Sequence, residues 1–284
     1  MIIGGFAGPG GWCEGARIAG YQGKMLGVDI SLDACRTAMA AGHARVVADV
    51  ATFPLEPLVG RVEGAILSPP CKDWSSTGTL AGYAGETGHL LREPLRWCLM
   101  LRPLWTAWEC TPNKPVRARF AADAEVLQRA GYDVWTGVLN AEDYGVPSTR
   151  KRAILVAHRG RTVGPPTPTL GGPASMAHAL GWDGAELVSN YGTGGDAQRR
   201  GRRPMHMPAF TMTGKCGRNK WAWPDGTTRP LSIDEAAQLQ SFRPNYPWHG
   251  GSTSQQQQVG DAVPPLLAAA ILRPLINNES SAAA

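Results

Sequence analysis

The sequence lacks long apolar runs. None of its hydrophobic stretches approaches the roughly 18 residues that cross a membrane, and no basic region precedes a hydrophobic stretch at the N-terminus. We therefore expect no membrane association and a location in the cytoplasm. The six cysteines form no C-x-x-C pair or other metal-ligand spacing, so neither a zinc site nor a disulfide framework is indicated.

The chain is long enough to hold one large domain and a smaller lobe, with 284 residues of which 43% are hydrophobic. Up to His158, short apolar runs alternate with helical segments, the pattern of a parallel α/β sheet. Strands are expected at 2–3, 24–28, 45–48, 62–67, 104–109, 134–139 and 153–157, and helices at 11–19, 32–41, 94–101 and 117–130.

Periodicity is weak after His158, where Gly and Pro crowd the segment 164–173. A capping box at Ser232 predicts a helix over 233–240, and 264–276 is expected to form a last, strongly apolar helix against the sheet. We expect two units. Residues 1–158 and 255–284 form the main domain, and residues 159–254 form a small, loop-rich one.

Acidic residues are scarce between Asn190 and Lys220, where Asp196 is the single acid. Seven basic residues share this segment: Arg199, Arg200, Arg202, Arg203, Lys215, Arg218 and Lys220. A solvated loop is one interpretation. Contact with the phosphates of a nucleic acid fits the excess of positive charge better.

A glycine turn follows the first strand and contains Gly8, Gly10 and Gly11. Such a turn lets a ligand approach backbone amides at a helix N-terminus. Asp29 ends the second strand, where an acid can accept hydrogen bonds from ribose hydroxyls, and Asp49 ends the third, where it could bind an exocyclic amine. The turn does not follow the G-x-G-x-x-G pattern of dinucleotide-binding proteins.

Cys71 follows Ser68, Pro69 and Pro70 directly after the apolar strand 62–67. Two prolines fix φ and remove backbone donors, so the thiol is expected on a rigid turn at the edge of the sheet where α/β enzymes act. A free cysteine has a pKa of about 8.5, and ionising it near pH 7 costs about 2 kcal/mol, which a cation or helix N-terminus can offset. This placement suits a nucleophile.

Four motifs in this order resemble those of the DNA cytosine methyltransferases of the carbon-5 type. They are F-x-G-x-G-G at 6–11, P-P-C at 69–71, the strand-ending acid Glu109 and G-D-A-V-P at 260–264. The resemblance extends from Phe6 to about Ile271, apart from the middle segment. It implies a Rossmann-like, S-adenosylmethionine-dependent methyltransferase sheet with a small target-recognition domain.

The resemblance also implies roles for individual residues. Cys71 would add to carbon 6 of a flipped cytosine in double-stranded DNA, and Glu109 would hold and protonate ring nitrogen 3. Arg150 would contact the base oxygen or a phosphate, and Arg152 would brace the site. S-adenosyl-L-methionine, with no metal, would be bound by Phe6, Gly8, Gly10, Gly11, Asp29, Ile30, Asp49, Val50, Pro69, Asp261 and Val263.

The chain departs from the family pattern at several positions: Lys72 and Ser148 replace Gln, Cys110 follows the catalytic acid in place of Asn, and Asp261 replaces Asn. A catalytically inactive DNA-binding homologue therefore stays open, as does methylation of RNA cytosine. Methylation of an exocyclic amine would need an aromatic residue where Cys71 stands. Cys110 is expected to be a packed thiol.

The expected partner is double-stranded DNA, with a cognate restriction endonuclease as a second candidate. We expect a monomer in the cytoplasm of a bacterium or of a phage-infected host.

Overall fold

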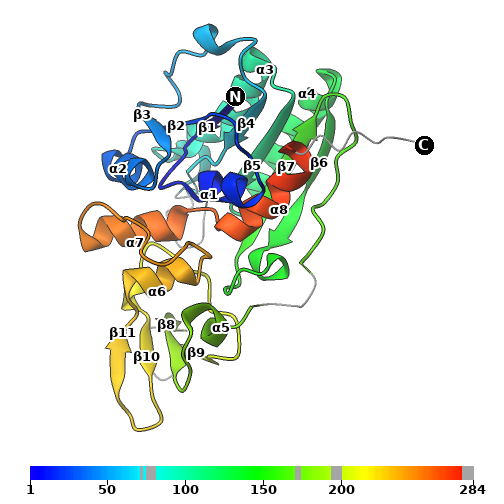
Figure 1. Cartoon of the computed structure of the whole chain (residues 1–284). Coiled ribbons are helices and arrows are strands. Elements are labelled where there is room, and N and C mark those ends of the chain that lie inside the picture. The colour runs from blue at the N-terminus through cyan, green and yellow to red at the C-terminus, as the bar shows by residue number, and fades with distance from the viewer. Residues whose placement is uncertain (71–72, 75–80, 170–173, 193–199, 277–284) are drawn as a thin grey trace.

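The computed structural model describes residues 1–70, 73–74, 81–169, 174–192 and 200–276 (Figure 1). Its main part is a 7-stranded sheet in the order β3-β2-β1-β4-β5-β7-β6. The strands are β1 Ile2–Gly5, β2 Met25–Asp29, β3 Ala44–Val47, β4 Gly64–Leu67, β5 Trp105–Cys110, β6 Asp133–Asn140 and β7 Lys151–His158. Together with its flanking helices this sheet is a Rossmann-like α/β fold, as expected from the sequence.

The sheet is mixed rather than wholly parallel. Strands β1 to β5 pair in parallel, but β7 runs antiparallel to both β5 and β6. The expectation of a parallel sheet is therefore wrong at β7. The physical reason lies in the connection from β6 to β7, which holds only the short 3-10 turn Ala141–Tyr144, whereas a parallel connection needs a crossover of a dozen residues or more.

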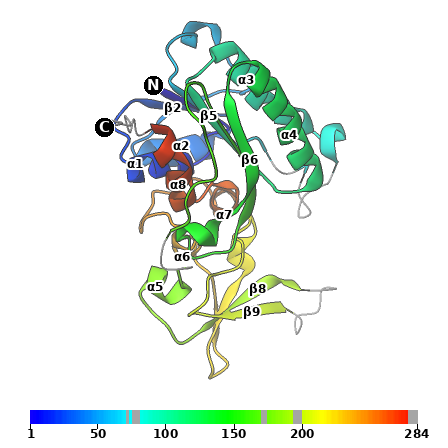
Figure 2. The same cartoon turned by 90° about the vertical axis from the view of Figure 1, so that its right-hand side faces the viewer.

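Helices cover both faces of this sheet, as Figure 2 shows. One face carries α3 Glu93–Leu101 and α4 Lys114–Arg129, and the other carries α1 Gly11–Ile18 and α8 Pro265–Ile276. Helix α2 Leu32–Ala40 follows β2 and is capped by Ser31, whose hydroxyl accepts a hydrogen bond from the amide of Ala34 at 3.3 Å. The apolar helix expected at the C-terminus is α8, and its buried residues make it a core helix.

The stretch Ser252–Ile276 would be long and apolar enough to cross a membrane by length and composition. It comprises two helices, α7 Ser252–Asp261 and α8, which are separated by a break at 262–264. In its most apolar window 67% is buried inside the protein. Packing in the core accounts for this hydrophobicity.

A second, smaller sheet lies below the main one in Figure 1. It is antiparallel, in the order β11-β10-β8-β9. Its strands are β8 Glu186–Gly192, β9 Arg200–Pro204, β10 Lys220–Ala222 and β11 Thr228–Pro230, accompanied by helices α5 Met176–Leu180 and α6 Ile233–Gln238. It has its own hydrophobic core around Trp221, Phe242 and Tyr246. The expected domain boundaries at 158 and 255 stay a prediction.

Candidate active site

Residues expected to bind the cofactor lie at the carboxyl ends of neighbouring parallel strands. The glycine turn follows β1, Asp29 ends β2, and Pro69 comes shortly after β4. Backbone hydrogen bonds continue the strand pairing beyond these ends, from the amide of Ser68 to the carbonyl of Gly5 and from Ala48 to Asp29. The fold therefore brings these segments to one edge of the sheet, where open α/β sheets bind their ligands.

The glycine turn has an unusual backbone. Phe6, Gly8 and Gly10 adopt positive φ values of 55°, 52° and 113°. For a bulky residue such as Phe6 this conformation costs on the order of 1–3 kcal/mol and is typical of functional sites. A Cβ atom at Gly8 would meet nothing within 4 Å, whereas one at Gly11 would lie 2.0 Å from the carbonyl oxygen of Val263. The turn is thus open at Gly8 and closely packed at Gly11.

Asp29 holds the turn from β2. Its Oδ2 accepts a hydrogen bond from the amide of Gly8 and its Oδ1 accepts one from Ser31, both at 2.8 Å. A carboxylate has further acceptor capacity for ligand hydroxyls. The neighbouring Ile30 is 72% exposed, which leaves an apolar side chain in solvent beside the turn. A flat apolar group of a ligand could cover it.

Asp49 and Val50 follow β3 and differ in exposure. Asp49 is exposed, and its Oδ1 accepts a hydrogen bond from the amide of Ala51 at 2.9 Å. Val50 is buried, and its carbonyl accepts a hydrogen bond from the indole of Trp97 at 3.2 Å. Asp49 is therefore available to solvent, while the Val50 side chain belongs to the core.

The expected nucleophile Cys71, with Lys72, lies outside the residues that the structure describes. The described residues on either side are well anchored. Before it, Pro69 is buried and the Ser68 hydroxyl accepts a hydrogen bond from Trp12 Nε1 at 2.8 Å. After it, the buried Asp73 accepts hydrogen bonds at 2.7 Å from the amide and the hydroxyl of Thr87.

Glu109 and Arg152 form a buried ion pair. Nε of Arg152 on β7 lies 2.7 Å from Oε1 of Glu109 on β5, and the two side chains are 13% and 3% exposed. The contact is too poorly aligned to count as a hydrogen bond, and neither atom has another partner among the described residues. Opposite charges at this distance hold each other in place, so Arg152 fixes the position of the Glu109 carboxyl.

Arg150 lies elsewhere, with only 1% of its surface exposed. Its NH1 donates hydrogen bonds to the carbonyls of Met212 at 3.1 Å and Gly260 at 2.8 Å. It therefore ties the start of β7 to the small sheet's region and to the C-terminal motif. Arg150 thus joins three segments of the described structure, and Arg152 lies beside Glu109. The roles expected for the two arginines stay a prediction.

The C-terminal motif packs against the glycine turn. Val263 is buried, and its carbonyl is the group that leaves no room for a side chain at Gly11. Asp261 is exposed and accepts a hydrogen bond from Gln257 Nε2 at 2.7 Å. Cys110 is fully buried and contacts the carbonyl of Pro69 at 3.9 Å, as expected for a packed thiol.

A sequence profile described as "C-5 cytosine-specific DNA methylase" matches residues 1–170 and 174–277. The chain belongs to this family. The methylase is 27% identical over 315 residues to the type II methyltransferase M1.HphI of Haemophilus parahaemolyticus, covering 94% of this chain and 84% of that protein. It is 29% identical to M.AplI of Arthrospira platensis, over 94% of this chain and 83% of that one.

Solved structures share the methylase's fold. One, described as a DNA modification methyltransferase encoded within an E. coli prophage, superposes with a TM-score of 0.73 at 18% identity, covering 96% of this chain and 97% of that one. The S. pombe Dnmt2 methyltransferase superposes with a TM-score of 0.72 at 13% identity, covering 97% and 99%. At these identities the likeness concerns the fold.

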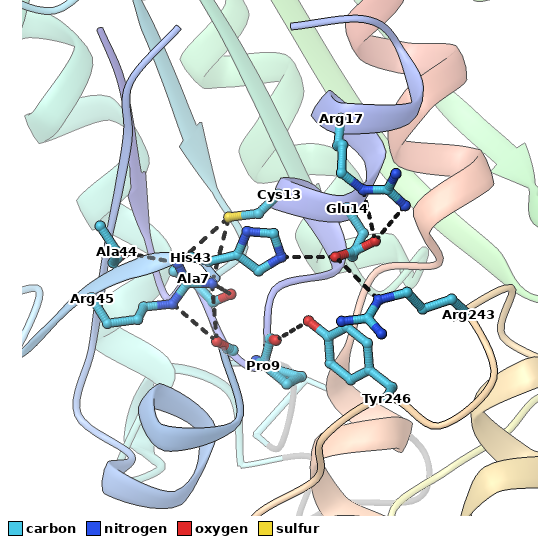
Figure 3. A network of polar contacts seen from close by, with 11 residues as sticks. Ala7, Pro9, Cys13, Glu14, Arg17, His43, Ala44, Arg45, Arg243 and Tyr246 are labelled. Atoms are coloured by element: carbon cyan, nitrogen blue, oxygen red, sulfur yellow. Dashed lines mark hydrogen bonds and ion pairs between the residues drawn. The ribbon is translucent and has the colours of Figure 1, made fainter. Parts of the chain in front are cut away.

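The sequence did not indicate the residues that hold the glycine turn through its backbone carbonyls (Figure 3). Arg45 and Tyr246 donate hydrogen bonds to carbonyls of the turn, and the buried Glu14 on α1 contacts His43 and Arg17. None belongs to a motif used above, and no spacing in the sequence signals these contacts. Among the described residues, no group of three His, Cys, Asp or Glu side chains is placed to hold a metal ion.

Proposed function

We propose that this DNA methylase transfers a methyl group from S-adenosyl-L-methionine to carbon 5 of cytosine through a covalent adduct with Cys71. The observation that carries the proposal is the buried Glu109 carboxyl near the end of β5, which Arg152 Nε holds at 2.7 Å beside the strand that leads to Cys71. A cytosine edge offers the acceptors and the basic nitrogen that such a pair can bind. Both residues lie on strands adjacent to or near β4, which leads to Cys71.

The chemistry follows from the electronic structure of cytosine. Carbon 5 is a poor nucleophile until the Cys71 thiolate adds to carbon 6 and makes the ring an enamine. Glu109 assists by giving a proton to ring nitrogen 3, and Arg152 holds the Glu109 carboxyl and can donate to the base oxygen. After methylation the proton on ring nitrogen 3 returns to Glu109. A base then removes the proton from carbon 5, the bond between carbon 6 and sulfur breaks, and the Cys71 thiolate is released.

The residues at the strand ends fit S-adenosyl-L-methionine, which supplies the methyl group as a sulfonium. We propose that Asp29 accepts hydrogen bonds from the ribose and that Asp49 accepts one from the exocyclic amine of the adenine. The exposed Ile30 and the half-buried Phe6 would contact the adenine ring. The open space at Gly8 supports this proposal, because a ligand can approach the backbone there. Pro69, Asp261 and Val263 would complete the site.

We call the second sheet with its hydrophobic core and helices α5 and α6 the small unit. DNA would contact this unit through fewer cations than the sequence indicates. Arg202 forms an ion pair with Glu186 at 3.0 Å, and Arg203 lies over the Phe210 ring and donates to backbone carbonyls. Lys215 and Arg218 are exposed, while Arg199 lies outside the described residues. We expect the logarithm of the affinity to fall with the logarithm of salt concentration by roughly one unit per phosphate contact.

Trapping of the covalent adduct tests the mechanism. In duplex DNA with 5-fluorocytosine at the target position, methylation leaves no proton on carbon 5 to remove, so the enzyme should stay attached. We expect mass spectrometry to find the base on Cys71, and we expect no adduct with Cys71→Ser. The target position comes from conversion-based sequencing of genomic DNA in a methylation-deficient host that expresses the protein.

Three outcomes would contradict this proposal. An adduct on Cys110 would move the nucleophile to β5, and methylation of RNA but not of DNA would change the substrate. Soluble protein that binds DNA without product would support the inactive homologue.

We further propose that the enzyme works as a monomer inside a bacterium or a phage-infected host, with a restriction endonuclease of the same target as its partner. The type II methyltransferases among its relatives support the second point. Light scattering of the pure protein tests whether it is a monomer. Protection of host DNA from endonucleases of matching specificity tests the second.

A further inference from the structure

Three successive carbonyls of the glycine turn are held by side chains from distant parts of the chain. Arg45 at β3 donates to the carbonyl of Gly8 at 3.3 and 3.4 Å and to that of Ala7 at 3.5 Å. Tyr246 donates its hydroxyl to the carbonyl of Pro9 at 2.7 Å. Figure 3 shows both side chains converging on the turn. Hydrogen bonds from Arg45 and Tyr246 therefore fix the carbonyl side of the turn.

These hydrogen bonds to the carbonyls determine the direction of the amides that follow them. In a trans peptide the carbonyl and the following N–H point in opposite directions, because the peptide unit is planar. Holding the Ala7 carbonyl toward Arg45 directs the Gly8 amide the other way, where it donates to Asp29 Oδ2 at 2.8 Å. Holding the Pro9 carbonyl toward Tyr246 likewise directs the Gly10 amide away from the tyrosine. Gly10 caps the N-terminus of α1.

Tyr246 is well suited to act as a fixed donor. It is only 3% exposed, and burial raises the pKa of its phenol, so the hydroxyl stays protonated. Its ring packs against Phe242 and Trp248 in the hydrophobic core of the small unit. A side chain at Gly10 would lie 2.7 Å from the tyrosine oxygen, which shows how closely the two are fitted.

We propose that Tyr246 is a positioning residue for S-adenosyl-L-methionine, acting through the Pro9–Gly10 peptide. This links the core of the small unit to the cofactor turn. The inference rests on the cofactor role proposed above for that turn. It predicts a loss of cofactor affinity when the hydroxyl alone is removed.

Tyr246→Phe is the test variant, because it keeps the ring and removes the donor. Tyr132→Phe is a matched control. The Tyr132 hydroxyl also donates to a prolyl carbonyl, that of Pro103, at 2.7 Å, and Tyr132 is 5% exposed. Burial raises the pKa of Tyr132 to about 12, so it too stays protonated. The control residue lies between α4 and β6, away from the turn.

Calorimetry with S-adenosylhomocysteine measures affinity without turnover. We expect the Kd of Tyr246→Phe to rise about three- to tenfold, the change that the loss of one ordinary hydrogen bond produces. The KM for the cofactor should rise by the same factor, with kcat at saturation unchanged. Tyr132→Phe should keep the wild-type Kd. Both variants should show a similar fall in Tm, because each loses one buried hydrogen bond.

The possible failures are distinguishable. If Tyr246→Phe binds S-adenosylhomocysteine as tightly as the wild type, the role of Tyr246 is wrong but the proposed cofactor site stands. The same holds if Tyr132→Phe loses as much affinity as Tyr246→Phe. If the wild-type protein does not bind S-adenosylhomocysteine, the proposed cofactor site is wrong and the inference falls with it.

Discussion

Arg152 on β7 faces Glu109 on β5, with Nε and Oε1 2.7 Å apart and both side chains largely buried. The antiparallel pairing of the two strands produces this contact, since Glu109 lies opposite Ile154, two positions beyond Arg152. A strand that crossed over in parallel would present its arginines in a different register. The direction of β7 is thus part of the proposed catalytic geometry.

Arg152 and Arg150 should respond differently to substitution. Arg152→Lys keeps the charge beside Glu109 but loses the planar fork, so we expect kcat to fall by about 10- to 100-fold with little change in stability. Arg150→Met leaves two carbonyls without their donor and should cost about 2–4 kcal/mol of unfolding free energy. Methyl-transfer kinetics and urea unfolding measure the two effects. A stable Arg150→Met or a fully active Arg152→Lys would contradict these roles.

Two glycines of the turn should differ in what they tolerate. Gly8→Ala meets open space and should cost about 1 kcal/mol, because only the positive φ is unfavourable. Gly11→Ala would drive its Cβ against the backbone of Val263 and should cost about 1–3 kcal/mol or more. Thermal unfolding of both variants checks the order, and a larger cost at Gly8 would refute this account of the packing.

Stability should depend on pH through Glu14. Burial by itself would raise the pKa of this carboxyl, but hydrogen bonds from His43 and Arg17 outweigh burial and hold the pKa below its usual range. A carboxyl whose pKa is lower in the folded state stabilises the fold above the pKa of the unfolded chain, about 4.3, and loses this contribution as the pH falls through the folded value.

Glu14→Gln should therefore be less stable than the wild type at pH 7, by about 1–3 kcal/mol, and the difference should shrink below about pH 4. Urea unfolding at several pH values measures it. Glu125→Gln is the control, because Glu125 lies on the surface 4.0 Å from Arg129 and should show no such trend. A difference that is constant with pH would exclude Glu14 as its source.

Buried thiols should be inert in the native protein. Burial raises the pKa of Cys98 to about 12 and the pKa values of Cys35 and Cys216 to about 11, so little thiolate forms at pH 8. We expect brief treatment with iodoacetamide to leave all three unmodified until urea is added. Peptide mass spectrometry reads the labelling, and native labelling of Cys98 at the rate of a free thiol would contradict its burial.

The local elements of the fold were largely readable from the sequence. The capping box at Ser232 is present, and β2 begins and ends one residue after the expected range. Helix α4 starts three residues earlier than expected, because Asn113 caps it and a proline occupies its first turn. These signals depend on near neighbours in the chain, which is why they can be found without a structure.

The sequence by itself determined the family motifs, the order of strands and helices along the chain and the residue types that the chemistry requires. Only the tertiary structure decided the direction of β7, the separate surroundings of Arg150 and Arg152, and the hydrogen bonds from Arg45 and Tyr246 to the glycine turn. Tyr246 and Pro9 are 237 positions apart. Contacts across such a distance depend on how segments far apart in the sequence pack, and no local pattern encodes them.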